Sequence, residues 1–389
     1  MMERLAFSVL AVATLTGAAR PEDSFQPTPA EQERFELMSR PNSWFLENLA
    51  GPREIIDGQR LDPKQQYYLE ARRRRTPEEV KLGLDMFHTA EGRIAARERL
   101  SREWALFTKV TAPMRTVEDV RIDGRGDPIP LRIYTPNVGA ESAEPSPILV
   151  YFHGGGWLYS NIEAVDRCVR LIANEARAIV VSVDYRLAPE HPWPAANDDG
   201  EDVFRWVLAN ATRLGGDPRM VGVGGDSAGG AISLSISRRQ LAAGRATPAY
   251  QLLYYTSTDF STEDESYRLF RDGYGLDENF RQFMISLVFP NGSLKAATHE
   301  LSSGSFSGMP ATIVVTAGFD ILRDAGRKLA RRLEQDGVAV TYLNYPTLAH
   351  GFLQWSAVVE DAERAAVDTA RLFGGAIRSR VGQMRTVGK

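Results

Sequence analysis

The spacing of apolar side chains along the chain changes once, and the change separates two kinds of predicted structure. From residue 61 to 112 apolar positions recur with the period of an α-helix. From Val117 onward the period shortens, and residues 117–122 and 129–134 are predicted to form two strands. The polar, glycine-containing residues between these runs indicate a β-hairpin.

Beyond the hairpin, short apolar runs alternate with helical patterns. A strand is expected to begin at Val221, with others over 148–152, 178–183, 250–255, 312–316 and 338–345, and helices over 164–176, 198–210, 322–335 and 358–372. Strands that are apolar throughout and separated by helices form mostly parallel sheets covered on both faces. The expected fold is therefore α/β, with the hairpin as an antiparallel edge.

The N-terminal residues resemble an export signal. An apolar run from Leu5 to Leu15 is followed by small residues suited to cleavage, and it is too short to span a bilayer. We expect residues 1–19 to be removed and the protein to be periplasmic or secreted; the alternative is a cytoplasmic protein with this helix packed on its body. Residues 20–60 are expected to form a linker or short helices.

Composition excludes several classes of partner and site. The chain has 389 residues, a net charge of −4 and a pI near 5.9, which argues against a nucleic-acid or anionic-membrane partner. No stable membrane anchor is expected, because the apolar run from Leu5 to Leu15 is too short. Its one cysteine, Cys168, is expected to be buried, and it cannot form an internal disulfide. No metal site is expected, because no histidine pair has zinc-ligand spacing. The four arginines at 72–75 are expected on a solvated face.

Gly225-x-Ser227-x-Gly229 is the strongest candidate for chemistry. This pattern places a serine on a strained turn between a strand and a helix, where its oxygen projects beyond the sheet. Glycine is needed on both sides, since a Cβ would collide as the backbone bends. Alone the pentapeptide is weak evidence, so its meaning depends on a base and an acid elsewhere.

A serine nucleophile needs a base, and in this architecture the order along the chain is serine, acid, histidine. The chain has five histidines, and His350 is the one that follows a suitable acid. Asp320 comes directly after the strand expected at 312–316, at the carboxyl edge of the sheet. Asp324 competes, but it lies a helical turn further on, where aspartate usually caps a helix. We therefore expect Asp320 to be the acid.

Residues 153–157, His-Gly-Gly-Gly-Trp, follow a buried strand and predict the second element of an oxyanion hole. The hole would comprise the backbone N–H groups of Gly154, Gly155 and Ala228. His153 precedes the serine, so it fails the order test for the base and is expected to brace the loop by hydrogen bonding.

Taken together, five motifs in this order resemble the bacterial hormone-sensitive-lipase family (family IV) of esterases. They are His153–Trp157, Asp184–Ala196, Gly225–Gly230, Asp320–Asp324 and His350–Phe352. The resemblance extends from about residue 61 to the C-terminus. It implies an α/β-hydrolase fold with a helical cap, no cofactor, and action on carboxylic esters with short acyl chains. It also implies that Ser227 is the nucleophile, Asp320 the acid and His350 the base.

The chain departs from the family pattern in three places. Ile321 and Ala325 replace the proline and glutamate usual around the acid, and Ser160 stands where the family often has glycine. None of these changes removes a catalytic group. They bear on substrate preference and local rigidity.

Two helical regions are expected to form a cap over Ser227: residues 61–112, and an insertion at about 260–294 within the main domain, 113–389. An insertion between neighbouring strands on their carboxyl side must lie above the turn that carries Ser227. Cap and loops bring bulky aromatic residues towards the site, and together these predict a closed pocket, although any single one is more often ordinary core: Trp157, Tyr159, Trp193, Phe319, Phe352 and Trp355.

The sequence thus predicts a serine carboxylesterase that hydrolyses small-molecule esters with short acyl chains through an acyl-enzyme. An amidase, carbamate hydrolase or lactonase with the same triad is the alternative among enzymes. A small-molecule receptor on an inactive hydrolase scaffold is a third hypothesis, and the presence of all three triad residues argues against it.

Overall fold

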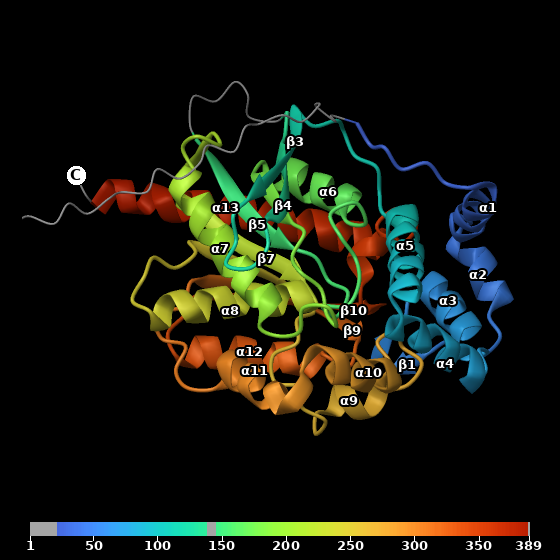
Figure 1. Cartoon of the computed structure of the whole chain (residues 1–389). Helices are drawn as coiled ribbons and strands as arrows, with labels where there is room; N and C mark the ends of the chain where they lie inside the picture. The colour runs from blue at the N-terminus through green and yellow to red at the C-terminus, as the bar shows by residue number, and fades with distance from the viewer. Residues whose placement is uncertain (1–21, 138–144, 388–389) are drawn as a thin grey trace, which may run out of the picture.

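The structure is a computed structural model that describes residues 22–137 and 145–387, with side chains to residue 380 (Figure 1). The export signal expected at residues 1–19 lies outside the described residues. In the part of the chain that is described, no helix is long and apolar enough to cross a membrane.

An eight-stranded sheet forms the centre of the molecule, in the order β10-β9-β8-β7-β5-β6-β4-β3. The six strands from β10 to β6 are parallel, whereas β4 is antiparallel to β6 and β3 is antiparallel to β4. Their bounds are β3 (Thr116–Ile122), β4 (Ile129–Thr135), β5 (Ser146–Phe152), β6 (Ile179–Val183), β7 (Gly216–Asp226), β8 (Tyr250–Tyr254), β9 (Ala311–Phe319) and β10 (Val340–Ala349). The predicted α/β fold, with a parallel sheet and a hairpin edge, is confirmed.

Helices cover both faces of this sheet. On one face lie α6 (Asp166–Ala176) and α13 (Glu360–Val387), which pack against each other. On the other lie α7 (Ala195–Asn210), α8 (Ala228–Ala242) and α12 (Arg323–Gln335). The central strands are apolar on both sides and almost fully buried, as a sheet between two helical layers requires.

Residues 22–60 contain α1 (Pro29–Met38), α2 (Asn42–Asn48) and a small ribbon of β1 (Ile55–Ile56) and β2 (Gln59–Arg60). This segment packs on the body of the protein. Phe45 is fully buried, and the Glu31 carboxylate forms an ion pair with Arg102.

Two groups of helices lie beyond the carboxyl ends of the strands (Figure 1). The first contains α3 (Pro63–Arg73), α4 (Pro77–Asp85), the short η1 (Met86–His88) and α5 (Ala90–Phe107). The second contains α9 (Glu265–Phe270), α10 (Glu278–Val288), η2 (Pro290–Gly292) and α11 (Ser293–Ser302). Side chains from both groups and from the strand ends enclose a cavity of about 670 Å³.

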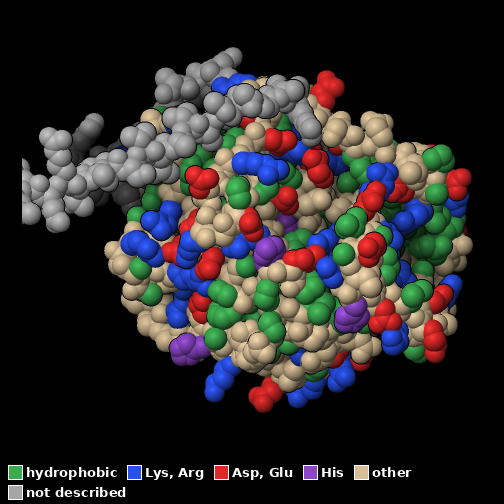
Figure 2. All heavy atoms as spheres, in the orientation of Figure 1, with side chains coloured by type: hydrophobic (Ala, Val, Ile, Leu, Met, Phe, Trp, Pro, Cys, Tyr) green, Lys and Arg blue, Asp and Glu red, His purple; other side chains and the backbone are tan. Residues whose placement is uncertain are grey.

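The outer surface carries both signs of charge. On the face drawn in Figure 2, lysine and arginine side chains are interspersed with aspartate and glutamate. Such mixing gives no continuous positive field of the kind that binds a phosphate backbone.

Candidate active site

Ser227 occupies the turn between β7 and α8, at the floor of the cavity. Its backbone has φ 54° and ψ −115°, a strained conformation for a residue with a side chain. A Cβ added at Gly229 would lie 1.8 Å from the carbonyl oxygen of Phe152, and one at Gly225 would lie 2.2 Å from the same atom. Only glycine fits at these two positions, which explains why the motif has glycine on both sides of the serine.

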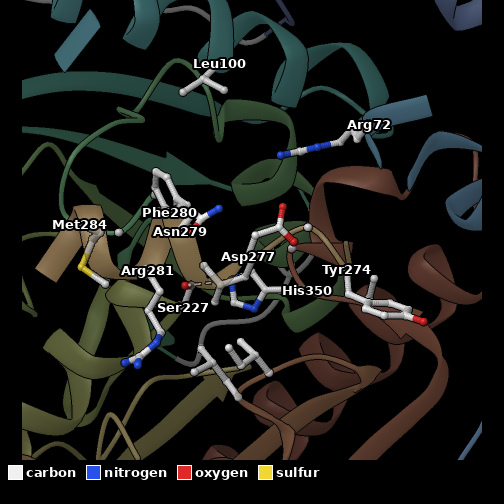
Figure 3. Close-up of a pocket in the computed structure, with 18 of the residues that line it drawn as sticks. Arg72, Leu100, Ser227, Tyr274, Asp277, Asn279, Phe280, Arg281, Met284 and His350 are labelled. Carbon is white, nitrogen blue, oxygen red and sulfur yellow. Dashed lines mark hydrogen bonds between the residues drawn. The ribbon is translucent and has the colours of Figure 1, made fainter. Parts of the chain in front are cut away.

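The structure brings His350 and Asp320 to this serine. His350 Nε2 lies 3.0 Å from Ser227 Oγ (Figure 3). His350 Nδ1 lies 2.8 Å from Asp320 Oδ2. Asp320 directly follows β9, and His350 directly follows β10, so parallel strands deliver both side chains to one edge. The Asp320 carboxylate is buried and also accepts the Leu322 N–H at 2.9 Å, which fixes its orientation.

Asp324, the competing carboxylate, has other partners. It accepts the backbone N–H of Ser266 at 2.8 Å and pairs with Arg323 at 3.1 Å. These contacts hold the pKa of Asp324 below its usual value against the opposing effect of burial. Asp324 therefore connects α12 to the segment that begins α9.

The three expected backbone donors have different surroundings. The Gly154 N–H donates to the Asp226 carboxylate at 2.9 Å, so in this structure it is not free for a ligand. Gly155 and Ala228 line the cavity, as does Gly156, which the sequence interpretation did not include. Within the described residues, no acceptor takes the N–H groups of Gly155 or Ala228. These two N–H groups remain available above Ser227.

Asp226 is a functional candidate that the sequence interpretation missed. Its buried carboxylate accepts hydrogen bonds from Tyr151 Oη at 2.7 Å, Gly154 N–H at 2.9 Å and Gln354 Nε2 at 3.3 Å. Burial raises its pKa above the usual value. Its place beside the serine was a signal, but its partners come from segments far apart in the sequence. The carboxylate thus connects the oxyanion loop, the central sheet and the loop after His350.

His153 has a bracing geometry, as expected. Its buried ring stacks on Tyr185 with centroids 4.3 Å apart, and Nδ1 lies 2.7 Å from the Gly154 carbonyl oxygen. The Tyr185 hydroxyl donates to the His153 carbonyl at 2.7 Å. Burial lowers the pKa of His153 to about 4, so the ring is neutral at neutral pH.

The aromatic lining differs in part from the expectation. Trp157, Tyr159 and Trp355 line the cavity, but Trp193, Phe319 and Phe352 do not. Phe319 and Phe352 are fully buried in the interior, where they fill space between the sheet and neighbouring elements. The sequence showed that these residues are close to strand ends but not which way their side chains point.

The arginine run differs from the expectation of a solvated face at one position, Arg72. Arg72 lines the cavity, and Arg73 forms an ion pair with Glu54 and donates to the Gly273 carbonyl at 2.9 Å. Arg73, Arg74 and Arg75 are exposed, as expected, whereas Arg72 is partly buried. Helical periodicity explains the split, because consecutive helical residues point in different directions.

Cys168 is buried, and its burial raises the pKa of the thiol. Among the residues that the structure describes, no group of histidine, cysteine, aspartate and glutamate side chains has the arrangement of a metal site.

Comparison with known proteins agrees with this geometry. A family model described as alpha/beta hydrolase fold matches residues 149–354, and a carboxylesterase family model matches residues 107–190. Carboxylesterase NlhH of Mycobacterium tuberculosis is 37% identical over 285 residues, which cover 72% of this chain and 88% of that protein. Ethyl acetate hydrolase of Pseudomonas putida is 31% identical, over 70% of this chain and 86% of that protein.

A solved structure is similar over most of its length. It is the ester-hydrolase EH1AB1 from the metagenome of Lake Arreo, in complex with a derivative of bipyridine phosphonate. It is 34% identical to this chain, has a TM-score of 0.70, and aligns over 77% of this chain and 98% of its own. The chain therefore belongs to the hormone-sensitive-lipase family (family IV) of α/β-hydrolases and is a carboxylic ester hydrolase.

Proposed function

We propose that this hydrolase cleaves short-chain carboxylic esters through an acyl-enzyme formed on Ser227. The observation that carries the proposal is the continuous chain of hydrogen bonds from Ser227 Oγ through His350 to Asp320, at 3.0 Å and 2.8 Å. A hydroxyl becomes an effective nucleophile when an adjacent base takes its proton. In this chain, His350 Nε2 is the base within reach of the hydroxyl.

The reaction proceeds in two halves. Ser227 Oγ attacks the ester carbonyl while its proton passes to His350 Nε2, and the buried Asp320 carboxylate orients the ring and stabilises its positive charge. His350 then gives the proton to the leaving alcohol, and the acyl group remains on the serine. Water repeats the sequence, which releases the acid and restores the hydroxyl.

The developing oxyanion is stabilised by the N–H groups of Gly155 and Ala228. Both residues line the cavity, and Ala228 is the first residue of α8, where the helix dipole favours negative charge. Gly154, which donates to Asp226, has the different task of holding the loop in place.

Two facts support short acyl chains. The cavity is enclosed by helices from two segments, and a relative with 31% identity is an ethyl acetate hydrolase. A closed pocket favours short chains because each methylene gains binding energy only where apolar wall remains.

A fluorophosphonate probe followed by peptide mapping tests the mechanism. We expect one labelled residue, Ser227, and loss of p-nitrophenyl butanoate hydrolysis in step with labelling. An unlabelled protein, or a labelled one that keeps its activity, contradicts the proposal. Parallel assays with the anilide of the same acid separate an esterase from an amidase.

We also propose export, on the basis of residues 1–19 alone. Protein isolated from its native host should begin near Arg20. N-terminal sequencing that finds Leu5–Leu15 still attached contradicts this.

A further inference from the structure

One wall of the cavity carries polar side chains that the proposed mechanism does not use. Arg72, near the end of α3, and Asp277, the residue just before α10, both line the cavity. Figure 3 shows the two side chains reaching toward each other from opposite walls, near Ser227 and His350.

Arg72 lacks a close acidic partner. Within the described residues, no carboxylate lies within salt-bridge distance of its guanidinium, whose neighbours are the ring and hydroxyl of Tyr68. Glu103, an acid on the same side, is already engaged: it accepts the Tyr68 hydroxyl and pairs with Arg34 at 3.4 Å. An enclosed cation without a paired carboxylate has donors to offer to a ligand.

Two more groups extend this polar wall. Tyr159, in the same loop as Gly155, also lines the cavity. Its ring is fixed against Trp104 and Phe280, with centroids 5.5 Å and 6.1 Å away. Asp277 uses one carboxylate oxygen to accept the Gly273 N–H at 2.7 Å, which leaves the other oxygen for a ligand.

The charges of Arg72, Asp277 and Glu103 restrict which chemical group of a ligand can bind at this wall. A carboxylate bound to Arg72 would face the like charges of Asp277 and Glu103, and an ammonium group would face Arg72. A hydroxyl both accepts and donates, so it can accept from the guanidinium and donate to the aspartate. A hydroxyl is therefore the small group that satisfies both walls without leaving a charge unbalanced.

We propose that the preferred substrates are esters that carry a hydroxyl group away from the scissile bond, bound between Arg72 and Asp277. This inference rests on the proposed function. The hydroxyl can belong to the alcohol, as in a polyol ester, or to the acyl group, as in a hydroxy-acid ester. Arg72, Asp277 and Tyr159 are then specificity residues of the same site.

Matched pairs of substrates test this. 2-Hydroxyethyl butanoate is compared with propyl butanoate, which places the hydroxyl on the alcohol side. Methyl 6-hydroxyhexanoate is compared with methyl heptanoate, which places it on the acyl side. Each pair exchanges one methyl group for a hydroxyl, and the readout is the ratio of kcat/KM within a pair. Monomethyl adipate serves as the anionic probe.

The ratio should favour the hydroxyl in one of the two pairs, and Arg72→Met should lower that ratio by about tenfold or more, since a missing hydrogen-bond partner is costly in a site built for it. Arg72→Gln keeps a donor without the charge and should retain part of the preference, and Asp277→Asn should lower it several-fold. Arg74→Met, an exposed arginine of the same run, is the control and should leave the ratio as in the wild type.

Other results overturn the inference. If both ratios stay unchanged in Arg72→Met while its Tm falls, Arg72 only joins the two helical groups. If monomethyl adipate shows the largest loss, the site recognises an anion. Failure of the proposed mechanism would be visible separately, as wild-type turnover of p-nitrophenyl butanoate that survives Ser227→Ala.

Discussion

The sheet edge and the helices above it line the same cavity but are held in different ways. Ser227, Asp320 and His350 each follow one of the parallel strands of the sheet, and the ladders of β7, β9 and β10 set their positions. Backbone sterics at Gly225 and Gly229 leave the turn little freedom. The reacting atoms are therefore placed by the most rigid part of the molecule.

The helices above the sheet have weaker support. Helix α4 lines the cavity yet buries none of its nine residues, and the polar wall depends on side chains from α3 and from the start of α10. These two positions are about 200 residues apart in the sequence. We infer a division between the two regions, in which the sheet positions the reacting groups and the helices determine the choice of substrate.

Loss of either group that handles the serine proton should have the largest effect. Ser227→Ala and His350→Ala should each lower kcat roughly 10⁴-fold to 10⁶-fold, because the triad acts as one unit. Steady-state kinetics on p-nitrophenyl butanoate measures this, and circular dichroism checks the fold. Near-normal turnover in either folded variant contradicts the triad.

The two aspartates near β9 should differ sharply. Asp320→Asn should lower kcat roughly 10³-fold to 10⁴-fold, because the amide no longer holds the imidazole in the required tautomer. Asp324→Asn, the matched control one helical turn away, should change kcat less than tenfold, because Asp324 contacts Ser266 and Arg323. The opposite ranking would show that the acid is Asp324.

The same division explains what could be predicted from the sequence. The turn at Ser227 could be predicted because local sterics demand glycine at two positions. His350 followed from chain order alone. Asp320 could be chosen because a strand end places it at the sheet edge. In each case a local constraint carried the information.

Features that depend on distant partners were not predictable. Gly154 was expected to face the oxyanion, but its N–H donates to Asp226, whose other partners include Gln354, 128 residues further on. Arg72 was expected to be solvated, and its place in the cavity depends on how α3 packs over the sheet. Helical phase alone could not show which way these side chains turn.

The buried ring of His153 should also give an acid-dependent loss of stability. The pKa of His153 is 6.5 ordinarily and about 4 in the folded protein, because burial disfavours its charged form. Between these values the unfolded state binds the proton and the folded state does not, so the free energy of unfolding falls as the pH is lowered from about 6.5 to about 4. The loss should total about 3 kcal/mol.

Urea unfolding across this pH window measures the loss. His153→Asn, which keeps a donor for the Gly154 carbonyl, should flatten the dependence by that amount, because carboxylates that titrate in the same range are common to both proteins. An identical slope in the variant would show that His153 is protonated in the folded state.

The cavity walls should limit acyl length. Specificity across p-nitrophenyl esters should peak at an acyl length of roughly two to six carbons and fall about 100-fold by twelve, once the chain meets the wall. Phe280→Ala, which removes a ring from that wall, should move the peak to longer chains. Phe283→Ala, which removes a ring outside the cavity lining, is the control. A profile that still rises at twelve carbons, with activation at an oil–water interface, would indicate an open groove.

The smallest expected effects come from two glycine-to-alanine substitutions, one in α4 and one in α13, which distinguish local from global stability. Gly83 in α4 and Gly375 in α13 both have helical neighbours, and an added Cβ at either would meet no atom within 4 Å. Alanine at each position should therefore favour its helix by about 1 kcal/mol. Because α13 packs against the sheet, Gly375→Ala should raise the free energy of global unfolding by about that amount.

Helix α4 buries no residue, so it can open while the sheet stays folded. Gly83→Ala should accordingly slow amide hydrogen exchange within residues 77–85 about fivefold, with little change in Tm, since 1 kcal/mol corresponds to that factor. Exchange mass spectrometry on both variants makes the comparison. A rise in Tm for Gly83→Ala equal to that for Gly375→Ala would mean that α4 unfolds only with the whole protein, and the rigid sheet and the looser helices above it would then be one cooperative unit.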